Sequence, residues 1–182
     1  MSGQTSATVA PTGDNLFLKA VAAISTVAGW CSAAMIVAAV GITCQMIVVR
    51  FVLNGSTVWQ TEAVIYLVIA ATLVGLPYVQ RLRGHVNVEL IPLMLGPRAR
   101  FALAVMTGLA SIGIVAVLLF YGYDYWHYAM KRGWTSDTVW AVPLWIPYLS
   151  IPVGFGLLLL QLIADFVALV LRIDRPFGLE DI

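Results

Sequence analysis

The feature that most constrains this chain is where its charged residues fall. Four long stretches, residues 20–49, 63–80, 101–123 and 138–164, contain no Asp, Glu, Lys or Arg. A helix needs about 20 apolar residues to cross the hydrocarbon core of a bilayer, which is about 30 Å thick. The pattern therefore predicts an all-α membrane protein with four transmembrane helices, spanning about 20–49, 58–80, 101–123 and 142–171.

Composition limits what else the chain can contain. Hydrophobic residues make up 61% of it and charged residues only 10%, whereas a soluble domain carries about a quarter charged residues. No segment between the spans is long enough to bury a core of its own. We expect one membrane domain at 16–172, a disordered tail at 1–15 and a second tail at 173–182. A net charge of +1 without a polybasic tail argues against nucleic acid as a partner.

The cationic residues outside the spans predict an orientation. Seven Lys and Arg fall on the side that holds both termini and the second loop, and three fall on the other side. The positive-inside rule then places both termini in the cytoplasm. Aromatic residues crowd around the third loop, as expected for an interfacial belt on the outer side: Tyr121, Tyr123, Tyr125, Trp126, Tyr128, Trp134, Trp140, Trp145 and Tyr148.

Two connecting segments have special composition. Residues 85–95 are strongly apolar, too short to span, bounded by arginines and ended by Gly96-Pro97. We expect them to lie in the cytoplasmic interface as a short segment between the second and third helices. Because proline removes a backbone donor, the prolines of the fourth span predict an irregular lead-in over 142–151 and a regular helix from about Pro152.

Few ionisable side chains could lie inside the membrane, where such groups are costly and often functional. Glu62 follows Trp59 by three positions, near the outer edge of the second span. Three roles stay open for it: a structural ion pair with Arg50 or an interfacial anchor, a contact with a partner chain, and ion transport. Asp165 and Asp124 are interpreted as interfacial anchors.

No pattern indicates a catalytic, metal or cofactor site, so we expect neither an enzyme nor a bound cofactor. His85 and His127 lie near opposite ends of the membrane, too far apart to ligate one haem iron. Zinc patterns, glycine-rich phosphate loops and nucleophile–base pairs are not found in the sequence. Cys31 and Cys44 are 13 residues apart on one predicted helix, about 20 Å at 1.5 Å per residue, too far to form a disulfide.

Small residues recur four positions apart in three spans, at Ala34 and Ala38, Ala71 and Gly75, and Ala104 and Gly108. Such spacing permits close helix contact. The remaining polar groups are too few for a transporter that binds and releases a polar solute by itself. The sequence instead suits a subunit that supports another protein. Two alternatives remain, a haem- or quinone-binding membrane anchor of a respiratory enzyme and a small exporter that acts alone.

The order of several motifs resembles one family. They are Arg50, Trp59-x-x-Glu62, Arg81-x-x-Gly84-His85-Val86-x-Val88-Glu89, Pro97-x-x-Arg100, Pro143 with Trp145-Ile146-Pro147-Tyr148, and Ile151-Pro152-Val153-Gly154. Together they resemble the small, DctQ-type membrane subunit of tripartite ATP-independent periplasmic (TRAP) transporters. Glu89 stands where Asp is more usual, which keeps the charge.

The resemblance implies a function and partners. It implies a bacterial inner-membrane scaffold subunit that pairs with a large, multi-span DctM-type permease. A periplasmic, DctP-type binding protein delivers the solute, usually an organic acid, and an ion gradient, typically sodium, drives uptake.

Candidate residues follow from the motifs and the loops. The expected structural or partner-interface residues are Arg50, Trp59, Glu62, Arg81, Arg83, His85, Glu89 and Arg100. Among them Arg81, Arg83, His85 and Glu89 crowd into nine positions, so we expect a cytoplasmic polar cluster that fixes the second helix against the interfacial segment. Lys131, Arg132 and Asp137 are expected to face the periplasm, as solvated loop charges or as contacts with the binding protein.

Overall fold

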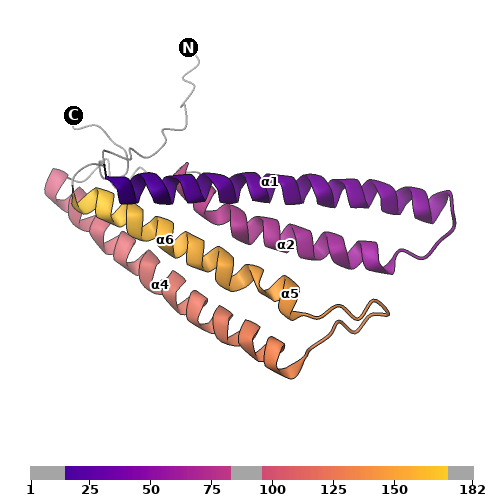
Figure 1. Ribbon diagram of the computed structural model, residues 1–182. Helices are drawn as coiled ribbons and strands as arrows, with labels where there is room; N and C mark the ends of the chain where they lie inside the picture. The colour runs from indigo at the N-terminus through magenta and orange to yellow at the C-terminus, as the bar shows by residue number, and fades with distance from the viewer. Residues whose placement is uncertain (1–14, 83–95, 172–182) are drawn as a thin grey trace, which may run out of the picture.

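The computed structural model describes residues 15–82 and 96–171, and its regular elements there are helices (Figure 1). They are α1 (Leu16–Phe51), α2 (Val58–Arg81), α4 (Pro97–Arg132), the short α5 (Trp145–Tyr148) and α6 (Ser150–Val170). Four helical segments are long and apolar enough to cross a membrane, with α5 and α6 together forming the fourth. The predicted all-α fold with four transmembrane helices is confirmed. The predicted interfacial segment at 85–95 and most of the two tails lie outside the described residues.

The four long helices lie side by side in a row. Figure 1 shows the order α1, α2, α6, α4, in which α2 packs between α1 and α6, and α6 packs between α2 and α4. We call the end where α1 and α4 begin the inner end, and the end where they finish the outer end. A row leaves large apolar faces open, as Val37 on α1 and Phe120 on α4 illustrate. In a membrane such faces need no common core, because lipid tails are as apolar as the side chains.

Helix α4 is longer than its predicted span, because the prediction followed the charge-free run. It passes residue 123 and continues through Asp124 to Arg132. Backbone hydrogen bonds hold a helix whether its side chains are apolar or charged, so these charges do not end it. Gly133 ends it, with φ at 61° and its N–H bonded to the Met130 carbonyl at 3.3 Å.

The fourth span begins with α5, a turn at Leu149 and then α6, which starts at Ser150 rather than at Pro152. Pro152 is tolerated because it falls in the first turn, where its missing N–H would have no partner within the helix. The Leu149 N–H still bonds to the Trp145 carbonyl at 3.1 Å, and the Val153 N–H bonds to Leu149 at 3.2 Å. The proline-rich lead-in is therefore largely helical and only briefly irregular.

Small residues lie where neighbouring helices approach most closely. Ala71 and Gly75 of α2 are buried, and a Cβ added to Gly75 would lie 2.8 Å from the Ser32 Oγ of α1. A Cβ on Gly108 would lie 3.1 Å from the Phe166 ring of α6. Two of the three predicted small pairs thus contribute to helix contacts. Ala34 and Ala38 are instead exposed on α1.

Candidate functional site

A hydrogen-bond network joins three helices near the inner end. Gln80 of α2 donates its Nε2 to the Asp165 carboxylate of α6 at 3.0 Å, and Gln161 of α6 donates to the other carboxylate oxygen at 2.7 Å. The Oε1 of Gln161 accepts the Ser25 hydroxyl of α1 at 2.6 Å. Ser25 and Gln161 are only 1% and 4% exposed. Buried polar groups are costly unless paired, and this network pairs them while linking α1, α2 and α6.

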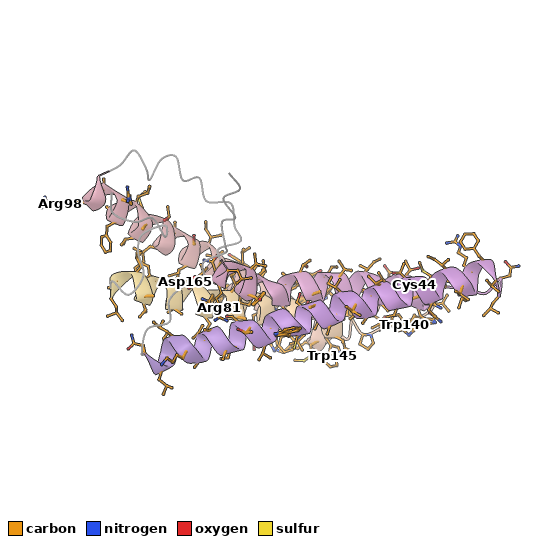
Figure 2. All side chains as sticks on the ribbon, turned by 90° about the horizontal axis from the view of Figure 1, so that it is seen from above. Cys44, Arg81, Arg98, Trp140, Trp145 and Asp165 are labelled. Atoms are coloured by element: carbon orange, nitrogen blue, oxygen red, sulfur yellow. The ribbon has the colours of Figure 1, made fainter. Side chains whose placement is uncertain are left out.

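Arg81 makes a second connection at the same end. Its Nη1 donates to the Ala22 carbonyl of α1 at 3.0 Å and also to the Thr26 hydroxyl. Thr26 in turn donates to the Ala22 carbonyl at 2.7 Å. Figure 2 shows Arg81 and Asp165 in the same region of the molecule, well away from Trp140. The arginine therefore fixes the end of α2 against α1.

An apolar cluster lies beside this network. Leu18 and Val21 of α1 pack with Ala164 and Ala168 of α6. The first turns of α1 thus cover the end of α6. We define Ser25, Gln80, Arg81, Gln161 and Asp165 as the inner polar network.

At the outer end Glu62 has a different partner from the one expected. Its Oε1 accepts the Ser136 hydroxyl at 2.5 Å, whereas Arg50 is exposed in the last turn of α1. Of the roles left open for Glu62, the ion pair with Arg50 does not form; the carboxylate instead accepts a hydrogen bond from residues 133–144, the loop between α4 and α5. The second carboxylate oxygen of Glu62 is buried and accepts no hydrogen bond from the described residues. Sequence reasoning could not find Ser136, because that serine is one small polar residue among many in a loop.

Aromatic side chains pack around the same loop. The Trp59 and Trp140 rings meet edge to face with centroids 6.2 Å apart, and Tyr125 lies 5.2 Å from Tyr148. The Trp126 Nε1 donates to the Trp145 carbonyl at 3.0 Å. Aromatic residues on α2, α4, α5 and the loop thus gather at one end, as the belt prediction required.

The other candidate residues are distributed over both ends. Lys131 and Arg132 are exposed in the last turn of α4, where Arg132 lies 4.4 Å above the Tyr128 ring, and Asp137 is exposed on the loop. Arg100 lies in the first turns of α4. Arg83, His85 and Glu89 fall outside the described residues, so the predicted cytoplasmic cluster stays a prediction. His127 stacks on Tyr123 at 5.9 Å.

The described residues contain no group of three or more His, Cys, Asp or Glu that could hold a metal ion. Cys31 and Cys44 are both unpaired thiols. Sequence analysis named Arg81 and Asp165 but missed the hydrogen bonds that connect Ser25, Gln80 and Gln161 with Asp165. The signal was present in the sequence, since Gln80, Gln161 and Asp165 are the polar residues at the inner ends of two apolar runs.

The fold and these contacts define a class, a multi-pass membrane protein in which polar side chains join helices to each other. The family described as "Tripartite ATP-independent periplasmic transporters, DctQ component" matches residues 39–172. The chain belongs to this family, and it is therefore a component of a TRAP transporter. The resemblance seen in its motifs is confirmed.

A relative supports the same assignment. The chain is similar to a protein of Vibrio cholerae serotype O1 named "C4-dicarboxylate TRAP transporter small permease protein DctQ". The two are 22% identical over 138 residues, which cover 64% of this chain. The chain matches 60% of the length of that relative.

Proposed function

We propose that this chain is the small permease subunit of a secondary-active, binding-protein-dependent importer of organic acids in the bacterial inner membrane. An ion gradient, typically of sodium, supplies the energy, and the chain acts as a scaffold for a large, DctM-type permease subunit. Membership of the DctQ family supports the subunit role. The printed name of the Vibrio relative, which includes C4-dicarboxylate, supports organic acids as the cargo class.

The scaffold role is supported by the hydrogen bonds that the polar side chains between the helices make with one another. Asp165, Gln161, Gln80 and Ser25 are engaged with one another between α1, α2 and α6. A transport site needs polar groups that are free to meet a solute. Side chains that bond helix to helix instead make the row stiff, and the exposed apolar faces of α1 and α4 offer area for a large partner or lipid.

The outer end suggests where the binding protein docks. If both termini are cytoplasmic, residues 133–144 and the end of α4 face the periplasm. Lys131, Arg132 and Asp137 are exposed there and present charges of both signs. We propose these residues as contacts for a DctP-type binding protein. Arg50, Arg100 and the cluster of Arg81, Arg83, His85 and Glu89 are proposed as structural or partner-interface residues.

The test is reconstitution with and without partners. The chain, a DctM-type large permease from the same genome and a DctP-type binding protein are purified, and uptake of a labelled C4-dicarboxylate into liposomes is followed under an inward sodium gradient. We expect uptake only when all three proteins are present. Accumulation by the chain alone would contradict the scaffold role.

The competing hypothesis of a haem- or quinone-binding anchor makes a separate prediction. An anchor of the haem type would give the purified chain a haem absorption band that changes on reduction. We expect a purified chain with protein absorption only, because the two histidines lie at opposite ends of the predicted topology. A haem band with stoichiometric iron would overturn the proposed function.

A further inference from the structure

The loop at residues 133–144 has a defined fold of its own. Two backbone bonds close it, from the Ser136 N–H to Val142 at 2.9 Å and from the Leu144 N–H to Trp134 at 2.8 Å. Thr135 and Pro143 form an antiparallel bridge between them. The Ala141 N–H bonds to the Thr138 carbonyl at 3.0 Å and completes the turn. The loop is thus a small hairpin that begins at the end of α4 and returns to α5.

Two residues of α2 hold this hairpin, and both belong to the Trp59-x-x-Glu62 motif. Positions three apart lie on the same side of a helix. Glu62 accepts the Ser136 hydroxyl at 2.5 Å, and the Trp59 ring packs against the Trp140 ring. The two motif residues therefore contact Ser136 and Trp140 of the hairpin from one face of α2. We call this contact the loop clamp, formed by Trp59, Glu62, Ser136 and Trp140.

Ser136 links the clamp to the tip of the hairpin. Its Oγ lies 3.2 Å from the Thr138 Oγ1 and accepts the Thr138 N–H at 3.3 Å. One hydroxyl thus connects the Glu62 carboxylate to the turn that carries Asp137, Thr138 and Val139. A hydrogen bond to a charged group is stronger than a neutral one, so Glu62 stabilises the turn and not only the base of the loop.

The clamp has consequences for the exposed tip. Asp137 and Thr138 are exposed, and Val139 is 95% exposed. A loop fixed before binding loses less conformational entropy on association than a mobile loop does. The tip thus presents an almost fully exposed apolar side chain, Val139, close to the charged Asp137. Both side chains suit a partner protein whose surface combines an apolar contact with a polar rim.

We infer that Trp59 and Glu62 are positioning residues, which hold the hairpin at residues 133–144 in one conformation so that its tip receives the periplasmic binding protein. The inference rests on the proposed function. It assigns a role in docking to two residues that contact neither the binding protein nor the solute. It assigns the Trp59-x-x-Glu62 motif to the periplasmic loop of the same chain, rather than to an ion pair or to transport.

The test measures the uptake rate of the reconstituted three-part transporter as a function of the concentration of binding protein. Ser136→Ala removes the donor to Glu62, and Thr135→Ala is the matched control at the exposed neighbouring position. We expect Ser136→Ala to raise the half-saturating concentration of binding protein about tenfold. The maximal rate should stay within about twofold, because a positioning role affects docking rather than the later transport steps. Thr135→Ala should leave both quantities unchanged.

A double variant tests whether Glu62 acts through Ser136. The half-saturating concentration of Glu62→Gln with Ser136→Ala should match that of Ser136→Ala alone within about twofold, since the two changes break one contact. If the fold-changes that the two substitutions cause in the half-saturating concentration multiply in the double variant, Glu62 acts elsewhere and the inference is overturned. A fall in maximal rate with unchanged half-saturation would also overturn it, because that pattern belongs to a scaffold defect.

Hydrogen exchange on the purified full chain gives an independent readout. In Ser136→Ala and in Trp59→Ala, the backbone N–H at position 136 and that of Leu144 should exchange about tenfold faster, while amides in the middle of α2 stay protected. Unchanged exchange in the loop would refute the clamp. Failure of the wild-type transporter to use any binding protein would instead refute the proposed function and leave the exchange result to decide on the clamp.

Discussion

At the scale of the single residue, Gly154 sets how closely α2 and α6 approach. A Cβ built on it would lie 2.7 Å from the Leu73 carbonyl oxygen and 2.8 Å from the Leu73 carbonyl carbon. Those atoms are backbone and cannot rotate away as a flexible side chain could. Any side chain at position 154 must therefore push the two helices apart at the point where the two halves of the row meet.

Gly154→Ala should accordingly destabilise the chain by about 1 to 3 kcal/mol, as overpacking does. The matched control is Gly113→Ala on α4, where an added Cβ meets no atom within 4 Å. The control should be neutral or stabilising by up to about 1 kcal/mol, because alanine is the better helix former. Thermal unfolding in detergent compares the two, and equal melting temperatures would show that α2 and α6 are not in this contact.

At the scale of the element, the helices are joined unequally. Hydrogen bonds link α1, α2 and α6 at the inner end, through Ser25, Gln80, Gln161 and Asp165. Two close contacts of α4 with α6 are apolar, with Gly108 against Phe166 and Gly122 against Ile151. Directional bonds fix register as well as distance, so the hydrogen bonds at the inner end should hold α1 and α2 in register with α6.

The link between α1 and α6 can be measured by a double-mutant cycle on Ser25→Ala and Gln161→Ala. Polar pairs between membrane helices average about 0.6 kcal/mol and reach about 1.7 kcal/mol. We expect a coupling free energy near the upper figure, because both side chains are buried. Ser111→Ala on the exposed side of α4 is the control, and its coupling free energy with Gln161→Ala should be too small to measure. Additive effects of the main pair would contradict the observed bond.

At the scale of the whole molecule, a row of helices has two ends that differ in chemistry. The inner end holds Lys19, Arg81, Arg98 and Arg100, while the outer end holds the aromatic belt and the folded loop. The positive-inside rule predicts that the arginine-rich end stays in the cytoplasm. In the proposed orientation, the loop at residues 133–144 faces the periplasm.

Cysteine labelling tests this orientation. In a chain with Cys31 and Cys44 replaced by alanine, Thr135→Cys should react with a membrane-impermeant maleimide in intact spheroplasts. Ala99→Cys, exposed near the start of α4, should react only after the membrane is opened. Both substitutions leave every charge in place, so the topology itself is not altered. Labelling of Ala99→Cys from outside would reverse the proposed orientation.

The limits of sequence reasoning are visible in particular residues. The charge-free runs identified four helices but missed the end of α4, because a helix continues through Asp124 and Arg132 until Gly133 turns the backbone. The motif identified Glu62 as a candidate, yet the partners it suggested were cations, Arg50 or a charge on a partner chain, because a carboxylate pairs most readily with a cation. Ser136 lies 74 positions away, and only the return of the loop to α2 brings the hydroxyl to the carboxylate.

The sequence by itself determined that this is a four-helix membrane protein and a DctQ-family subunit, because hydrophobic length and motif order are properties of the linear chain. The tertiary structure alone decided that the helices form a row, that Gln161 and Asp165 together join three of them, and that Trp59 and Glu62 hold a loop. Those facts depend on which side chains meet across helix faces. A hydrogen bond acts over about 3 Å, so its partner is fixed by packing in space and cannot be inferred from distance along the chain.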